Sequence, residues 1–267
     1  MNKAQKAMLE MREMDELASM SSFVHRMSPL SKLMMTIVYI AVTASFNRYD
    51  LTGLVFMVIF PVILYQMSYV PVSTCFIKLR GILPLILAVG ILNPFFDRAT
   101  VMKIGSLEIS GGVISMITLM MKGVFSLMFS FLLMATTRID ELCQGLRKIH
   151  FPRAITSLLL LTYRYSSVLL REVSNMTDAY HLRAPGQKGI HISAWGTFLG
   201  QLLLRTMDRG DSLYNAMVIR GFSGEFLYAG NKEYIRCSMI MAIIVCGLMI
   251  LSRFYNIPAI IAGVYIK

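Results

Sequence analysis

The chain has 267 residues, of which 56% are hydrophobic and only 15% are charged, and its formal net charge is +11. Its mean hydropathy is +0.62, whereas soluble domains are typically about 45–50% apolar and about 25% charged. A soluble protein of this length could not bury so much apolar surface. The composition therefore excludes an ordinary soluble domain and indicates an integral membrane protein, in which Lys and Arg gather in cytoplasmic loops and no nucleic-acid partner is expected.

Residues 1–28 predict a helix that lies in the cytoplasm or at the membrane interface. The stretch mixes acidic and basic side chains with Met, Ala and Leu, and no uninterrupted apolar core separates them. A cleaved signal peptide needs an apolar region of about 7–15 residues, so none is expected here.

Five apolar segments predict membrane-spanning helices, because a span needs about 20 mostly apolar residues. Residues 51–77 carry no charge and are the strongest of the five. The others are residues 29–46, 81–96, 111–137 and 237–266. Lys32 interrupts the first segment and is expected to extend to a lipid headgroup, and Arg253 is expected to mark the outer limit of the last. The sequence thus predicts four spans within residues 29–137 and a final span within residues 237–267.

Lys122 is the most deeply placed charge, inside the predicted span of residues 111–137. An ionisable group at membrane depth is a candidate functional site. One interpretation is therefore that Lys122 contacts an ion, a substrate or a partner subunit. The alternative is that its aliphatic stem lets the ammonium reach the interface.

The distribution of basic residues predicts the orientation. With the N-terminus in the cytoplasm, the outer loops hold only Arg48, Arg98 and Lys103, each with an acidic residue nearby. The opposite orientation would place at least 13 basic residues outside, counting residues 138–236 alone. The first arrangement follows the positive-inside rule. We therefore expect a multi-pass protein of the cell membrane with a cytoplasmic N-terminus.

Residues 138–236 differ from the rest of the chain and predict a cytoplasmic helical section. They hold 13 of the 26 basic and 8 of the 15 acidic residues, and their longest runs free of both charged residues and His are only 10 and 13 residues. Such runs are too short to span a membrane. A first helix is predicted to begin after Thr137 as N-cap and to end near Lys148.

Two longer helices follow in this section. Pro152 suits the first turn of a second helix, which is predicted to end at Arg183, before the helix-breaking Ala184-Pro185-Gly186. A third is predicted to begin near Ser193 and to end at Arg220-Gly221, where Gly is typical of the residue after the C-cap.

The second and third predicted helices share a plan. Each begins apolar, becomes charged toward its end and carries one Arg at its C-terminal limit, Arg183 and Arg220. One interpretation is that these Arg residues only complement the negative ends of the helix dipoles. The other is that the two ends enter two equivalent sites on a partner, since a guanidinium binds carboxylates or carbonyls in a bidentate manner.

The sequence resembles the transmembrane T component of energy-coupling factor (ECF) transporters, specifically the cobalt-type CbiQ family, over residues 28–226. The resemblance lies in SPLSKLMMTIVYIAVTASFNRYDLTGL, LTYRYSSVLLREVSNMTDAYHLRAPGQKG and LLLRTMDRGDSLYNAMVIRGFSGE. It implies an all-α membrane protein with about five transmembrane helices. A cytoplasmic helical coupling section, residues 138–236, precedes the last span.

The resemblance also implies partners and a function. A T component is a non-catalytic scaffold in the lipid bilayer of a bacterial or archaeal cell. It joins two ATP-binding-cassette ATPase subunits to a substrate-binding S component, here a cobalt-binding membrane subunit, with a small accessory membrane subunit as a further partner. Motion driven by ATP on the ATPases is passed to the S component for cobalt uptake, which supplies cobalamin biosynthesis. This chain itself is then expected to hold no cofactor.

By position, the resemblance makes Arg183 and Arg220 the residues that couple to the ATPases. Family members end both helices in Ala-Arg-Gly, whereas this chain reads Leu182-Arg183-Ala184 and Ile219-Arg220-Gly221. Only the Arg is common to both ends, so the prediction rests on it more than on its neighbours.

Other functions find little support in the sequence. It lacks the P-loop, the G-x-S-x-G elbow and the H-E-x-x-H motif, so neither an ATPase nor a membrane-embedded enzyme is expected. A stand-alone carrier would show repeated halves within the membrane. Nickel or a vitamin is the alternative cargo. No metal site is predicted, because neither the Cys residues nor the His residues have ligand spacing: His25, His150, His181 and His191.

Overall fold

The computed structural model describes residues 3–48, 50–96, 100–104, 107–187, 189–224, 226 and 233–254. In these ranges the chain is helical apart from one antiparallel hairpin of β1 (Thr100–Ile104) and β2 (Leu107–Ser110). The predicted all-α class therefore holds except for this hairpin. The chain divides into two compact units. The apolar unit comprises Leu17–Arg138 with Asn231–Lys267, and the basic unit comprises Met1–Glu16 with Ile139–Gly230.

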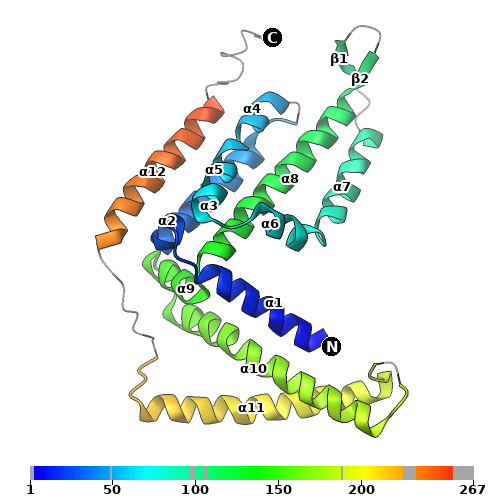
Figure 1. The fold of residues 1–267 in the computed structure, drawn as a ribbon, viewed down its shortest axis with the longest axis vertical. Helices are drawn as coiled ribbons and strands as arrows, with labels where there is room; N and C mark the ends of the chain where they lie inside the picture. The colour runs from blue at the N-terminus through cyan, green and yellow to red at the C-terminus, as the bar shows by residue number, and fades with distance from the viewer. Residues whose placement is uncertain are drawn as a thin grey trace. The chain divides into compact units, whose positions relative to one another are not determined.

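The apolar unit is built around one long helix, α8 (Gly111–Thr136). Helices α3, α4, α5, α6 and α7 all pack against α8, and α12 packs against α3 (Figure 1). Their bounds are α2 Phe23–Arg26, α3 Pro29–Ser45, α4 Leu51–Phe56, α5 Ile59–Ser68, α6 Val72–Leu79, α7 Leu83–Phe96 and α12 Glu233–Phe254.

Helix α8 is the one unbroken helix in the described ranges that is both long and apolar enough to cross a membrane. This confirms the predicted span of residues 111–137 as a continuous helix. Helix α3 and the Cys237–Arg253 part of α12 are apolar but shorter. The predicted last span extended to residue 266, and its end lies outside the described residues.

The prediction of one continuous helix over residues 51–77 is wrong. The chain bends by 115° between Gly53–Ser68 and Val72–Leu79. At the bend Tyr69 adopts the left-handed conformation, with φ 57°, and Pro71 follows two residues later. A proline has no backbone N–H and disfavours helical geometry in the residue before it. The absence of charge made this segment look like a single span, but backbone chemistry divides it.

The core of the apolar unit combines aromatic stacking with satisfied hydroxyl groups. The rings of Tyr39 and Phe129 stack with centroids 4.2 Å apart. The Tyr39 hydroxyl donates to the carbonyl of Met57 at 3.1 Å, and the Tyr65 hydroxyl donates to the carbonyl of Met128 at 2.9 Å. Each buried tyrosine thus contributes apolar area and leaves no buried donor unpaired.

Two glycines allow α7 and α8 to approach closely. A Cβ at Gly90 would lie 3.1 Å from Met120 Cγ, and a Cβ at Gly123 would lie 3.1 Å from Ile86 Cγ2. Both distances are tighter than ordinary van der Waals contact. Small residues at helix contacts are typical of membrane proteins, where close packing replaces the hydrophobic effect.

Lys32 is buried inside the unit, with 3% of its surface exposed. Its ammonium donates to the carbonyl of Thr136 at 2.7 Å and to the carbonyl of His25 at 3.0 Å. The prediction that Lys32 extends to a lipid headgroup is therefore wrong. Thr136 is the last residue of α8, where carbonyls lack partners within the helix and the dipole is negative. Lys32 therefore caps the C-terminus of α8.

The C-terminus of α3 is capped in the same way by two other cations. Lys122 Nζ donates to the carbonyl of Ala44 at 3.2 Å and also to the carbonyl of Phe46. Arg253 of α12 donates to the carbonyl of Ser45 at 3.2 Å and lies 4.8 Å above the Phe46 ring. Helices α3 and α8 thus each carry a lysine that caps the other helix.

These contacts predict unequal costs for removing the two lysines. Lys32→Met should lower the stability of the purified protein by about 1.5–3 kcal/mol, because it leaves buried carbonyls without a charged donor. Lys122→Met should cost less, since Lys122 is only half-buried. Thermal unfolding in detergent checks both variants, and an equal loss of Tm would contradict the ranking.

Candidate functional site

The basic unit contains the candidate coupling section. Its helices are α1 (Lys3–Ala18), α9 (Ile139–Lys148), α10 (Arg153–Arg183) and α11 (Trp195–Ile219), with the short 3₁₀ helix η1 (Ile192–Ala194) before α11. The predicted end at Lys148 and the predicted end at Arg183 are confirmed. Thr137 does not cap α9, because its hydroxyl is buried without a hydrogen-bond partner among the described residues.

Tyr163 links α1 to α10. The Tyr163 hydroxyl donates to Asp15 Oδ1 at 2.7 Å. Burial, together with this bond and the nearby negative charge, raises the pKa of Tyr163 to about 12. The phenol is therefore protonated at neutral pH and remains a donor. Sequence patterns gave no sign of this pair, since the two residues are 148 positions apart.

The end of α10 is a tight turn that leaves its Arg exposed. Ala184 is the C-cap, and its N–H donates to the carbonyl of Tyr180 at 3.0 Å. Gln187 N–H then donates back to the carbonyl of Ala184 at 3.4 Å, across Pro185 and a Gly186 with φ 93°. Proline followed by a positive-φ glycine is the signature of a type II turn.

Tyr180 holds the chain beyond this turn. Its hydroxyl donates to Gln187 Oε1 at 2.9 Å and accepts from the His191 N–H at 3.3 Å. His191 in turn accepts from Ser193 at the start of η1. The connection from α10 to α11 is thus built from side-chain bonds on either side of the turn, so the position of Arg183 is set by local structure.

The end of α11 is closed by a Schellman motif. Phe222 N–H donates to the carbonyl of Met217 at 3.0 Å, and Gly221 N–H donates to the carbonyl of Val218 at 2.9 Å. Arg220 is the C-cap and Gly221 has φ 81°. The predicted role of Gly221 as the residue after the C-cap is confirmed, because a residue with a Cβ is strained at this φ.

The two helix ends expose the same kinds of side chain, although different backbone turns close them. Arg183 and Arg220 are exposed, and the aliphatic residues before them, Leu182 and Ile219, have 84% and 86% of their surface exposed. A scattered exposed apolar residue is ordinary. An almost fully exposed Leu or Ile beside an exposed Arg, repeated at two helix ends, is instead typical of a contact that another chain completes.

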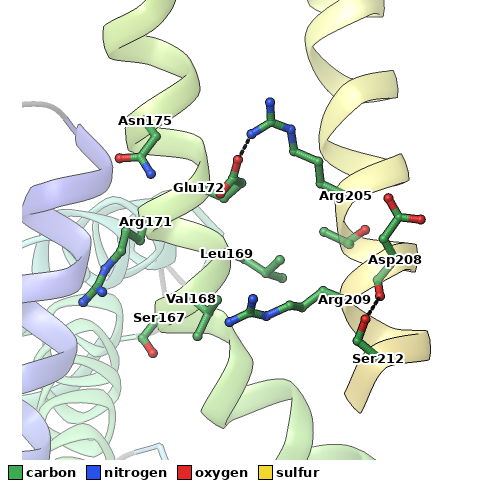
Figure 2. A pocket seen from close by; sticks show the side chains of 11 residues that line it. Ser167, Val168, Leu169, Arg171, Glu172, Asn175, Arg205, Asp208, Arg209 and Ser212 are labelled. Atoms are coloured by element: carbon green, nitrogen blue, oxygen red, sulfur yellow. Dashed lines mark hydrogen bonds and ion pairs between the residues drawn. The ribbon is translucent and has the colours of Figure 1, made fainter. Parts of the chain in front are cut away.

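Helices α10 and α11 face each other across a charged groove of about 640 Å³ (Figure 2). Glu172 of α10 forms an ion pair with Arg205 of α11 across it, and Arg209 also lines it. More than half of the Arg205 side chain is exposed, so this pair adds little to the stability of the unit. The sequence showed both charges but not their pairing.

Helix α11 has no buried residue among those described. Trp195, Leu199, Leu203 and Met207 follow one another at a spacing of four and are each about half-exposed or more. Residues at this spacing lie on one side of a helix. The basic unit therefore leaves an apolar stripe of α11, defined by these four residues, uncovered.

The described residues contain no group of three or more His, Cys, Asp or Glu that could hold a metal ion. His25 and His191 instead bond to nearby serines, Ser22 and Ser193, at 2.7 and 2.8 Å. Lys122 donates to main-chain carbonyls, as described above. Its role as an intramembrane functional charge stays a prediction.

Comparison with known proteins gives the family context. Residues 20–229 match the CbiQ family, described as cobalt transport protein. An uncharacterized protein of Methanocaldococcus jannaschii is 27% identical over 125 residues, covering 46% of this chain and 42% of that protein. The energy-coupling factor transporter transmembrane protein EcfT of Leuconostoc gelidum is 26% identical over 76% of this chain and 80% of the relative. EcfT of Clostridium kluyveri is 24% identical over 88% and 94%.

Replacing glycine by alanine should have opposite effects on stability at the closing turn of α11 and inside the helix. Gly221→Ala should destabilise the basic unit by about 1 kcal/mol, because Ala is strained at φ 81°. Gly210→Ala, inside α11 where nothing lies within 4 Å, should stabilise it by about 0.5–1 kcal/mol. Hydrogen exchange of the α11 amides measures the stability of both variants. A loss of stability in both would contradict the assignment of Gly221 as the residue after the C-cap.

Proposed function

Since this chain belongs to the CbiQ family of cobalt transport proteins, we propose that it is the membrane scaffold, or T component, of an ATP-driven ECF importer. It transmits motion from two ATP-binding-cassette ATPase subunits to a substrate-binding S component. The cargo is cobalt ion, supplied for cobalamin biosynthesis. ATP is bound and hydrolysed by the partner subunits, and this chain is not an enzyme.

The observation that carries the proposal is the pair of Arg-bearing helix ends. Two ends that differ in backbone construction present the same exposed pair, Leu182 with Arg183 and Ile219 with Arg220. Two similar helix ends are suited to equivalent sites on two copies of one partner. Each guanidinium would donate to carboxylates or helix-end carbonyls in an ATPase groove, and the adjacent aliphatic side chain would enter an apolar part of that groove. Ala184 and Gly221 keep the backbone behind each Arg compact.

A second surface supports the S component as the other partner. The apolar stripe of α11 has no cover within the described part of the basic unit, and Leu158 near the start of α10 is 66% exposed. Apolar helix faces of this kind are typical of helix-in-groove and helix-on-helix recognition. The same helices would then contact the ATPases at their ends and the S component along their apolar parts.

The proposal includes the predicted topology. Residues 1–28 and 138–236 lie in the cytoplasm with the ATPases, and residues 29–137 and 237–267 lie in the membrane. A basic section on the cytoplasmic side agrees with the positive-inside rule. We assign Lys122 first to capping α3, with contact to the S component as its proposed further role.

Charge reversal at both helix ends tests the coupling role. Arg183→Glu combined with Arg220→Glu should leave membrane insertion intact and lower ATP-driven uptake by at least about tenfold. Two buried charge-assisted contacts are replaced by repulsion, and each is typically worth about 1.5–3 kcal/mol. Uptake into vesicles that contain the full complex is the measurement.

The matched control is Arg12→Glu combined with Arg164→Glu, which reverses two exposed Arg of the basic unit away from the two helix ends. This control should keep most of the uptake. Normal uptake by the Arg183→Glu, Arg220→Glu variant would contradict the site assignment. An equal loss of uptake in the control would show that the effect comes from the change in overall charge.

Co-purification and cargo selection test the function itself. The chain expressed with its candidate ATPase subunits should be recovered with two ATPase copies in mild detergent. The reconstituted complex should take up labelled cobalt in preference to nickel or a vitamin. Recovery of the chain without ATPases would contradict the scaffold role, whereas preference for nickel or a vitamin would change only the cargo.

A further inference from the structure

A second groove, of about 770 Å³, lies at one end of the apolar unit. It is lined by residues just before α3, residues that end α5 and follow it, and residues near the start of α12. All three are apolar helices, so the groove lies where their apolar segments terminate. In a membrane protein this is the level of the lipid headgroups.

The lining of this groove is amphipathic. Met67 and Met241 supply flexible apolar surface beside the buried Met27, and Arg26 is the one charged residue among the described lining residues. Ser21, five positions before Arg26 in the sequence, adds a hydroxyl to the lining. A single cation with no carboxylate beside it suits one anionic group, while the methionines suit an alkyl chain.

Two aromatic side chains at the groove are exposed, as is typical of a membrane interface. Phe23 is 55% exposed and Tyr69 is 80% exposed. Tyr69 is held outward by the left-handed turn that ends α5, with φ 57°. Exposed aromatic rings at the ends of apolar helices are typical of the headgroup level of a bilayer.

We propose that this groove binds one anionic phospholipid, with its phosphate on Arg26 and one acyl chain along Met67 and Met241. The charge of the lining selects an anionic lipid, and its apolar part excludes a free phosphate ion as the principal ligand. The lining of the groove includes neither of the Arg-bearing helix ends, so the proposal stands apart from the proposed coupling function.

Native mass spectrometry of the full chain in detergent tests the site, with phosphatidylglycerol and phosphatidylcholine as probes. Wild-type protein should retain phosphatidylglycerol in preference to phosphatidylcholine. Arg26→Gln should bind phosphatidylglycerol about fivefold more weakly, the effect of one basic residue near an anionic surface, and Arg26→Lys should keep the preference. The control Arg80→Gln removes an exposed Arg at the end of α6 and should change nothing.

Cys237 supplies a second readout, since it lines the groove and is exposed while Cys75 and Cys143 are buried. A polar maleimide should label Cys237 more slowly in vesicles that contain phosphatidylglycerol than in pure phosphatidylcholine. Met67→Trp, which fills the apolar part, should abolish the difference. Equal retention of both lipids, unchanged binding in Arg26→Gln, or equal protection by soluble glycerol phosphate would each overturn the proposal.

Discussion

The capping of α8 by Lys32 is the interaction on which the apolar unit depends. A buried ammonium is costly unless it is fully hydrogen-bonded, and here it donates to Thr136 at the end of α8 and to His25 before α3. In an apolar surrounding the free carbonyls at a helix end are costly as well. One side chain satisfies both requirements and fixes where α8 ends, immediately before the chain enters the basic unit at residue 139.

The same chemistry explains the other cations of the apolar unit. Lys122 and Arg253 donate to three successive carbonyls at the end of α3, those of Ala44, Ser45 and Phe46. Helices α3, α8 and α12 are thereby joined by donors and acceptors as well as by packing. Charges within an apolar sequence suggest ion transport at first sight, but Lys32, Lys122 and Arg253 also cap helix ends in this unit.

The basic unit follows a different principle, because its main helices remain largely uncovered. Helix α11 has no buried residue among those described, and its contact with α10 includes the exposed pair of Glu172 and Arg205. Local devices therefore set the geometry of the exposed ends: a Pro-Gly turn after Arg183 and a Schellman motif after Arg220. Rigid ends on little-covered helices suit a subunit whose function is to contact and move with other chains.

The sequence by itself determined the membrane class, the family resemblance and the ends of α10 and α11, because composition and helix-ending residues act locally. It predicted Gly221 after the C-cap for the same reason. It placed Pro152 in the first turn of α10, whereas Pro152 is the N-cap and the helix begins at Arg153. Only the tertiary structure decided that Lys32 caps α8, that residues 51–77 bend by 115°, and that Tyr163 holds Asp15. Hydropathy counts charges along the chain but cannot tell which distant carbonyl a buried cation meets. Such contacts are made between helices far apart in sequence, and they decide whether a charge is structural or available to a partner.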